Sequence, residues 1–125
     1  FIGPTHEMMN ALGDKIQSKI VAKSVNVPTI PGGSKAVESK EEAIQVAREC
    51  GYPVMLKASA GGGGRGMRVV NAEEALIAEY HSAKSESKKA FGSDEIFIEK
   101  YLDKPKHIEV QVLGDTQGNL VHLFV

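Results

Sequence analysis

A run of four glycines constrains this chain more than any other feature of its sequence. The stretch SAGGGGRGM begins at Ser59 and separates two short apolar segments, PVMLKAS and MRVV, whose composition and alternation predict strands. Glycine loses more backbone freedom on folding than any other residue, so this run is costly unless something must approach the backbone closely. A linker would not join two apolar strands, and a hairpin turn needs only about two to five residues. We therefore expect a strand–loop–strand flap whose bare amide groups cover phosphates.

Two better-known glycine motifs do not fit this stretch. Gly61, Gly63 and Gly66 match the G-x-G-x-x-G spacing, but a dinucleotide-binding loop needs a helix directly after its glycines, and MRVV follows here. The Walker A pattern fails because Met67 stands where a lysine is required. The strand–loop–strand interpretation is the one that remains.

A lysine lies next to this loop on the predicted strand. Strict alternation in PVMLKAS places Lys57 on the face opposite Val54 and Leu56, four residues before the glycines. Its ammonium group is then within reach of phosphate oxygens bound by the loop, although a lone strand lysine more often lies at an edge with its charge in solvent. Arg65, inside the loop, is equally well explained as a second phosphate cation or as a solvated tip.

Composition narrows the classes of protein. The chain has 125 residues, of which 42% are hydrophobic and 25% charged, as in a soluble globular domain. A net charge of −1 gives no electrostatic reason to expect nucleic acid or an anionic membrane as partner. One cysteine excludes an intrachain disulfide and fits a reducing compartment, and with four scattered histidines it predicts no metal site. No apolar run is long enough for a membrane span or typical of a signal peptide.

Local signals predict a mixed α/β (α+β) order of elements. Two helices are expected before a Pro/Gly-rich connector, NVPTIPGG, and they are separated at Gly13-Asp14. A capping box from Ser39 to Glu42 opens a third helix, and Asn71 is expected to start a fourth. The segment EIFIEKYL reads as a strand, and KHIEVQVLGD with LVHLFV reads as a hairpin.

These elements suggest three parts. Residues 1–29 are expected to end a preceding domain, 30–102 to form a small α/β domain, and 103–125 to supply the first strands of a further domain. The chain has no initiator methionine and stops within an apolar alternation, so we expect a fragment of a longer protein.

The last predicted strand carries a polar face. His107, Glu109 and Gln111 alternate with Ile108, Val110 and Val112. An imidazole, a carboxylate and an amide in a row are either an ordinary solvated face or part of a binding site. The residues alone leave both open.

The motifs resemble a known family. YPVMLKASAGGGGRGM is similar to the signature shared by the ATP-binding domains of biotin carboxylases and carbamoyl-phosphate synthetases, which have the ATP-grasp fold. IFIEKYLDKPKHIEVQVLGDTQGN resembles biotin carboxylase in particular, and MNALGDKIQSK resembles the segment that leads out of that enzyme's first domain. The resemblance implies an ATP-grasp lid (B) domain, a small sheet with flanking helices and a glycine-rich lid, with truncated pieces of its neighbours.

The resemblance also implies an ATP site. Its members in this sequence are two phosphate-binding lysines, the lid glycines, the hinge around the adenine and a histidine near the ribose and phosphates: Lys15, Lys57, Gly61, Gly62, Gly63, Gly64, Gly66, Glu99, Lys100, Tyr101, Leu102 and His107. Lys100 and Leu102 are expected to act through their main chain, and Glu109 is a less certain member of the same polar cluster.

The implied reaction is the ATP-dependent carboxylation of biotin on a carrier protein, with bicarbonate and Mg²⁺. The family's magnesium carboxylates, bicarbonate-binding arginine and general base lie beyond Val125, so we expect no catalytic residue or metal ligand here and no activity from this chain alone. Implied partners are ATP, bicarbonate, the biotinylated carrier and a carboxyltransferase, in the bacterial cytoplasm or, as the less favoured site, the mitochondrial matrix. Another ATP-grasp ligase, such as carbamoyl-phosphate synthetase, and a non-catalytic nucleotide-binding module remain as alternatives.

Overall fold

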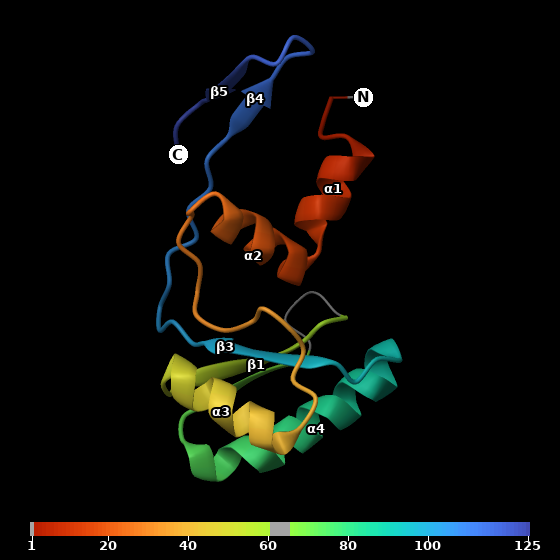
Figure 1. Ribbon diagram of the computed structural model, residues 1–125, viewed down its shortest axis with the longest axis vertical. Helices are drawn as coiled ribbons and strands as arrows, with labels where there is room; N and C mark the ends of the chain where they lie inside the picture. Colours follow the sequence, from red (N-terminus) through yellow and green to blue (C-terminus); the bar gives the residue numbers. More distant parts are fainter. Residues whose placement is uncertain (1, 61–65) are drawn as a thin grey trace.

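The computed structural model describes residues 2–60 and 66–125 and contains the predicted mixture of helices and short strands (Figure 1). In chain order its elements are α1 (His6–Gly13), α2 (Lys15–Ser24), α3 (Lys40–Cys50), β1 (Val54–Ala58), β2 (Met67–Val70), α4 (Glu73–Phe91), β3 (Ile96–Lys100), β4 (Val112–Gly114) and β5 (Leu120–His122). None of the helices within the described ranges is long and apolar enough to cross a membrane.

The break between the first two helices is confirmed at the predicted residues. Asp14 follows α1 in an extended conformation, and its carboxylate accepts hydrogen bonds from the backbone N–H groups of Ile16 and Gln17 at 2.9 and 2.8 Å. These are donors that the first turn of a helix cannot satisfy internally. The cap therefore fixes where α2 begins, and with it the positions of the lysines on that helix.

The other helix boundaries agree with the sequence in all but one place. Ser39 caps α3 by accepting the Glu42 N–H at 3.1 Å, and Gly51 ends this helix. Gly92 ends α4 in the left-handed conformation. The predicted start of α4 at Asn71 is wrong: Ala72 occupies the N-cap and makes no side-chain cap bond. Glu73 instead anchors the first turn, because its carboxylate binds the Arg48 guanidinium at 2.7 and 2.6 Å.

The main sheet has the strand order β2–β1–β3, with both pairs antiparallel. Residues 31–37 run along the outer edge of β3, where the Gly33 and Val37 N–H groups donate to the Ile98 and Ile96 carbonyls at 2.7 and 2.8 Å. The connector predicted from NVPTIPGG is thus hydrogen-bonded to the sheet, and β3 is bound along both edges.

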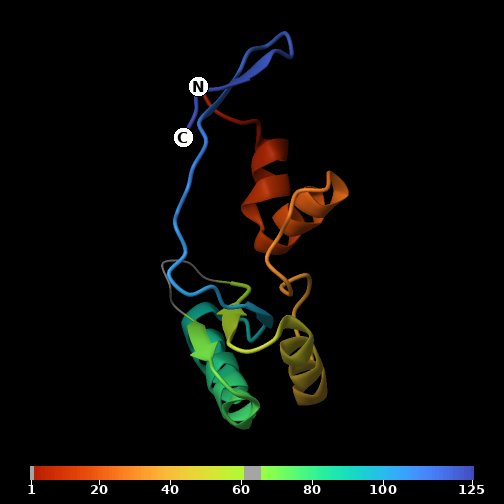
Figure 2. The same cartoon turned by 90° about the vertical axis from the view of Figure 1, so that its left-hand side faces the viewer.

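Helices cover the two faces of this sheet unequally. In both views α3 and α4 lie against one face, while α2 lies on the opposite side, over β3 (Figures 1 and 2). The buried core lies on the α3–α4 side and consists of Val37, Ala43, Ala47, Val54, Leu56, Ala58, Val70, Leu76, Tyr80, Ala83, Ile96 and Ile98. The α2 side carries the alternate residues of each strand, which include Lys57 and Glu99.

The C-terminal hairpin forms as predicted, but its first strand is shorter than expected. β4 pairs with β5 from Val112 to Gly114, and Asp115 closes the turn by accepting the Gln117 and Asn119 N–H groups at 2.9 Å. The strand expected from Lys106 onwards begins only at Val112. Ile108 and Val110 are 64% and 52% exposed, so no neighbouring element gives this alternating segment a surface to pack on.

Candidate functional site

The two strands that flank the glycine run are joined at its base. The Ala58 N–H donates to the Gly66 carbonyl at 3.1 Å, and the Ser59 N–H donates to the Glu95 carbonyl, just before β3, at 2.9 Å. Gly66 is buried with φ of 71°, and a Cβ on it would lie 3.0 Å from the Ala58 Cβ, so this position requires glycine. The predicted site residues Gly61, Gly62, Gly63 and Gly64 lie outside the described residues, and their role stays a prediction.

Strand β2, which follows the glycine run, is held to α4 by one arginine. The Arg68 guanidinium binds Glu79 at 3.0 Å and Glu86 at 2.7 Å. The hydrogen bond that Arg68 donates to Glu86 is the main cause that raises the pKa of Arg68, and the hydrogen bond to Glu79 adds to it. Both ends of the loop are therefore anchored, one by the sheet and one by this double ion pair.

On the α2 side of the sheet, Lys57 donates a hydrogen bond to Glu99 across the β1–β3 pair. The Glu99 side chain is only 8% exposed, and that of Lys57 is 26% exposed. The prediction that Lys57 points out of the strand on the face away from the core agrees with this arrangement. The structure thus brings together Lys57 and Glu99, two residues that the resemblance placed in one site.

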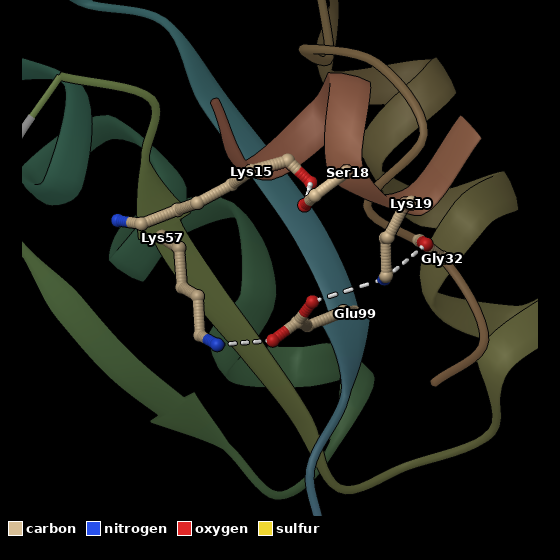
Figure 3. A network of polar contacts seen from close by, with 6 residues as sticks. All are labelled: Lys15, Ser18, Lys19, Gly32, Lys57 and Glu99. Carbon is tan, nitrogen blue, oxygen red and sulfur yellow. Dashed lines mark hydrogen bonds and ion pairs between the residues drawn. The ribbon is translucent and has the colours of Figure 1, made fainter. Parts of the chain in front are cut away.

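A third residue completes this cluster, and the sequence analysis missed it. Lys19 on α2 donates to the other Glu99 oxygen at 3.1 Å and to the Gly32 carbonyl at 2.7 Å (Figure 3). It lies four residues after Lys15, so both lysines share one face of the same helix. The four-residue spacing from Lys15 was the available signal for Lys19. It was not sufficient, because nothing in the sequence shows which face of α2 meets the sheet.

The cluster of Lys19, Lys57 and Glu99 has an excess of one positive charge. Burial of Glu99 disfavours its ionised form, but hydrogen bonds from Lys57 and Lys19 outweigh burial and lower the pKa of this carboxyl. The ionised carboxylate accepts a hydrogen bond from each ammonium group but balances only one of the two charges, so the cluster keeps a net positive charge that attracts an anion. Figure 3 shows the Lys15 side chain extending from the first turn of α2 in the direction of β1. The Lys15 position adds further positive charge to this side of the sheet.

The remaining residues of the predicted hinge lie at the end of β3. The Lys100 ammonium binds the carbonyls of Gly51 and Tyr52 at 2.8 and 2.9 Å, so its side chain is directed to the α3 side. The Tyr101 N–H donates to Pro53 at 3.1 Å, and Leu102 is 46% exposed. Because its side chain is bound there, a role of Lys100 in the ATP site would have to use its main chain, as the resemblance implies.

The structure does not bring His107 to the lysine cluster. Its side chain is 84% exposed and pairs with Glu109 at 3.0 Å, on the segment that leads away from the sheet (Figure 1). A cavity of about 270 Å³ lies between residues 31–37 and α3, but its lining includes neither Lys57 nor Glu99. The candidate site is therefore the open face around Lys57, Glu99 and α2.

Comparisons with known proteins agree with the resemblance. The family model described as carbamoyl-phosphate synthase L chain, ATP binding domain, matches residues 14–125. The 2-oxoglutarate carboxylase small subunit of Hydrogenobacter thermophilus is 52% identical over 123 residues, covering 98% of this chain and 26% of that protein. The mitochondrial propionyl-CoA carboxylase alpha chain of Homo sapiens is 50% identical over 123 residues, covering 98% of this chain and 17% of that protein.

A solved structure is similar over the same region. The biotin carboxylase domain of the Hydrogenobacter thermophilus enzyme, in complex with MgADP, ADP and bicarbonate, has a TM-score of 0.86 at 52% identity, over 98% of this chain and 27% of that one. This chain spans about a quarter of the length of that relative. Because the family model covers residues 14–125 and both relatives are carboxylases, the chain belongs to the carbamoyl-phosphate synthase L chain ATP-binding domain family, with the ATP-grasp fold, in its biotin carboxylase branch.

Proposed function

We propose that this chain is the nucleotide-binding part of a biotin carboxylase, with residues 30–102 as its lid domain. The observation that carries the proposal is the position of Lys57. Its partly exposed ammonium group lies on the face of the sheet opposite the core, near the end of the strand that enters the glycine run, in a cluster with an excess of one positive charge. A phosphate chain has the charge and the oxygen acceptors to fill this position.

In this proposal the chain's own residues bind and orient ATP. Lys57 and Lys15 neutralise phosphate charge, the glycines at 61–64 and Gly66 supply backbone N–H donors, and residues 99–102 offer main-chain groups to the adenine. His107 reaches the ribose and phosphates only if the segment after β3 lies closer to the sheet than in the present structure. Positioning of this kind supplies most of the catalysis in phosphoryl transfer.

The whole protein would use ATP and bicarbonate to carboxylate biotin on a carrier, whose carboxyl group a carboxyltransferase then receives. Magnesium belongs to this reaction, but the residues present do not form a site for it. Within residues 2–60 and 66–125 no three His, Cys, Asp or Glu side chains could hold a metal ion together, and Glu99 is bound by two ammonium groups. We propose, as the resemblance implies, that the magnesium ligands lie in the rest of the protein. The two relatives described above come from a bacterium and from mitochondria, and of these two compartments we propose the bacterial cytoplasm.

The first test measures Mg-ATP binding to the intact protein with Lys57→Met. Loss of one charge-assisted hydrogen bond is worth roughly 1.5–3 kcal/mol, so affinity should fall about 10- to 100-fold. Lys40→Met removes an exposed lysine on α3 and is the matched control, with unchanged affinity. Equal affinities of Lys57→Met and the native protein would contradict the proposal.

The second test locates the nucleotide on this chain by amide NMR. Titration of the isotope-labelled chain with Mg-ATP should shift the resonances of Lys57, Gly66 and residues 99–102, while those of α4 and the β4–β5 hairpin stay in place. Shifts confined to the hairpin would place the nucleotide elsewhere.

A third test separates a biotin carboxylase from carbamoyl-phosphate synthetase. The intact protein is assayed for biotin-stimulated ATP cleavage, which we expect here and which carbamoyl-phosphate synthetase would not show.

A further inference from the structure

The function of Lys57 proposed above conflicts with its contact in this structure. The ammonium group donates to Glu99, whereas binding a phosphate requires the same protons to point at the nucleotide. If Lys57 turned to the nucleotide and nothing else held Glu99, a nearly buried carboxylate would lose its counter-ion. Leaving one partner of a buried ion pair alone is among the more destabilising changes in a protein.

Lys19 is placed to prevent this. It binds the Glu99 oxygen that Lys57 does not use, and the Gly32 carbonyl fixes it from a second direction at 2.7 Å. Its side chain is only 15% exposed, compared with 26% for Lys57, so it is the more enclosed of the two cations. The two lysines belong to different elements, Lys57 to β1 and Lys19 to α2, and α2 lies on the other side of β3 from the helices of the core (Figure 3).

The backbone beside Lys19 is shaped to admit this contact. Gly33 is buried with φ of 66°, and a Cβ on it would lie 2.7 Å from the Lys19 nitrogen and 3.0 Å from a Glu99 oxygen. Any larger residue would displace the ammonium group from Glu99. Gly32 and Gly33, at the end of the connector, are therefore important for the Lys19–Glu99 contact as well as for the path of the backbone.

We propose that Lys19 is a positioning residue that serves as the permanent counter-ion of Glu99, and so allows Lys57 to transfer from Glu99 to a nucleotide phosphate. Glu99 holds Lys57 in place when the site is empty. When a phosphate arrives, Lys57 moves to it, and Glu99 stays ionised because Lys19 remains. This inference rests on the proposed ATP site and adds to it a residue that contacts no nucleotide.

The charged groups around Glu99 determine how pH tests this proposal. Lys19 faces it from α2 and Lys57 from β1, and hydrogen bonds from both lower its pKa. The neighbouring Lys100 directs its ammonium group to the Gly51 and Tyr52 carbonyls, and the Cys50 thiol of α3 is a group whose pKa Glu99 helps to raise. Burial raises the pKa of the Cys50 thiol, and in neither protonation state does this group carry a positive charge that could replace a missing ammonium group. Without Lys19, the pKa of Glu99 must rise, and Glu99 binds Lys57 more firmly wherever it is still ionised.

The test compares Lys19→Met with the native intact protein for Mg-ATP binding near neutral and at mildly acidic pH. Coupled groups commonly change each other's affinity about 5- to 150-fold, so we expect at least about tenfold weaker binding at neutral pH. At acidic pH protonation of Glu99 releases Lys57, and the ratio of mutant to native dissociation constants should fall towards one. Taking this ratio cancels the protonation of ATP itself. Lys19→Arg, which keeps the charge, should stay within about threefold of the native protein.

Lys23→Met is the matched control, because it removes an exposed lysine from the same helix. It should leave both affinity and its pH dependence unchanged. Native affinity of Lys19→Met at neutral pH would overturn the proposal. A weakening of equal size at both pH values would also overturn it, since that result indicates a structural role of Lys19 without charge compensation.

A nucleotide-free measurement separates this inference from the proposed function. The side-chain carboxyl carbon of Glu99 is followed by NMR against pH in ¹³C-labelled protein, with Glu99→Gln for assignment. The titration should move to higher pH in Lys19→Met and stay in place in Lys23→Met. If Lys57→Met binds ATP normally while this shift is present, the proposed ATP site is wrong and the counter-ion role of Lys19 stands. If the shift is absent, the counter-ion role is wrong whatever the ATP site proves to be.

Discussion

At the residue scale, Glu99 connects the sheet to α2. Its backbone pairs with Met55 across the sheet, and each oxygen of its carboxylate accepts one hydrogen bond from a lysine. Its two partners come from segments that are 80 and 42 residues away in sequence. These contacts form only in the folded chain, and they are strong only when Glu99 is ionised. Their contribution to stability therefore depends on the protonation of Glu99.

This dependence gives a pH prediction. The folded chain lowers the pKa of Glu99 below that in the unfolded chain, because hydrogen bonds from Lys57 and Lys19 outweigh burial. The ionised carboxylate therefore stabilises the fold above its unfolded pKa, and this stability is lost as pH falls through the folded pKa. Glu99→Gln should lower the free energy of urea unfolding by about 2 kcal/mol at neutral pH. The difference should shrink steadily towards acidic pH.

Glu95→Gln is the control for this comparison, since Glu95 is exposed just before β3. Its effect should stay within about 0.5 kcal/mol at every pH. If the difference in unfolding free energy between the native protein and Glu99→Gln does not change with pH, the native carboxylate contributes only through packing.

The same residues show how far sequence reasoning reaches. Lys57 could be placed on the open face because alternation along a strand is a local property. Lys19 could not be placed against Glu99, since that contact depends on how α2 meets the sheet. For the same reason the polar row of His107, Glu109 and Gln111 left a binding site and a solvated face both open, and the structure leaves His107 exposed beside Glu109.

At the element scale, the connector between α2 and α3 does more than join two helices. Residues 31–37 bind the edge of β3, and the Gly32 carbonyl binds Lys19. Helix boundaries were predicted well because caps are local: Asp14 and Ser39 act within their own turn. The start of α4 was missed because the Arg48–Glu73 ion pair, a contact between two helices, anchors it in place of a cap.

The connector yields a prediction with an internal control. Gly33→Ala and Gly92→Ala both place a side chain at positive φ, and each should lose about 1 kcal/mol from backbone strain. A Cβ on Gly92 has nothing within 4 Å, whereas one on Gly33 displaces Lys19. Gly33→Ala should therefore lose roughly a further 1–3 kcal/mol of unfolding free energy, the value of a charged hydrogen bond.

A second background isolates the cause of this extra loss. In Lys19→Met the penalty of Gly33→Ala should fall, because no ammonium group is left to displace, but it should stay above that of Gly92→Ala, since Glu99 and Phe97 atoms still lie 3.0 and 3.3 Å from the new Cβ. If Gly33→Ala costs the same free energy of unfolding with and without Lys19, the strain lies in the backbone. The space beside Gly33 would then not be needed for Lys19.

At the scale of the whole molecule, the described parts differ greatly in how much they bury. The sheet with α3 and α4 encloses the core, whereas α2, which has no buried residue, lies on the other side of β3 and reaches it through Lys19 (Figure 2). The β4–β5 hairpin is exposed along its whole length, with Leu120 at 71% and Phe124 at 77%. The sequence predicted that this hairpin exists, since alternation and a turn are local, but it could not show what covers the apolar side chains.

This difference in burial predicts the order in which the chain opens. Amides of β1 and β3, hydrogen-bonded within a buried sheet, should exchange with deuterium only on global unfolding, whereas those of residues 112–122 should exchange through local opening that costs little free energy. Hydrogen exchange followed by mass spectrometry at several protein concentrations measures both. Protection of the hairpin that equals that of β1 would contradict the prediction in dilute solution. Protection that appears only as concentration rises would instead show that a second copy covers Leu120 and Phe124, because exposed apolar side chains are stabilised by whatever surface removes them from water.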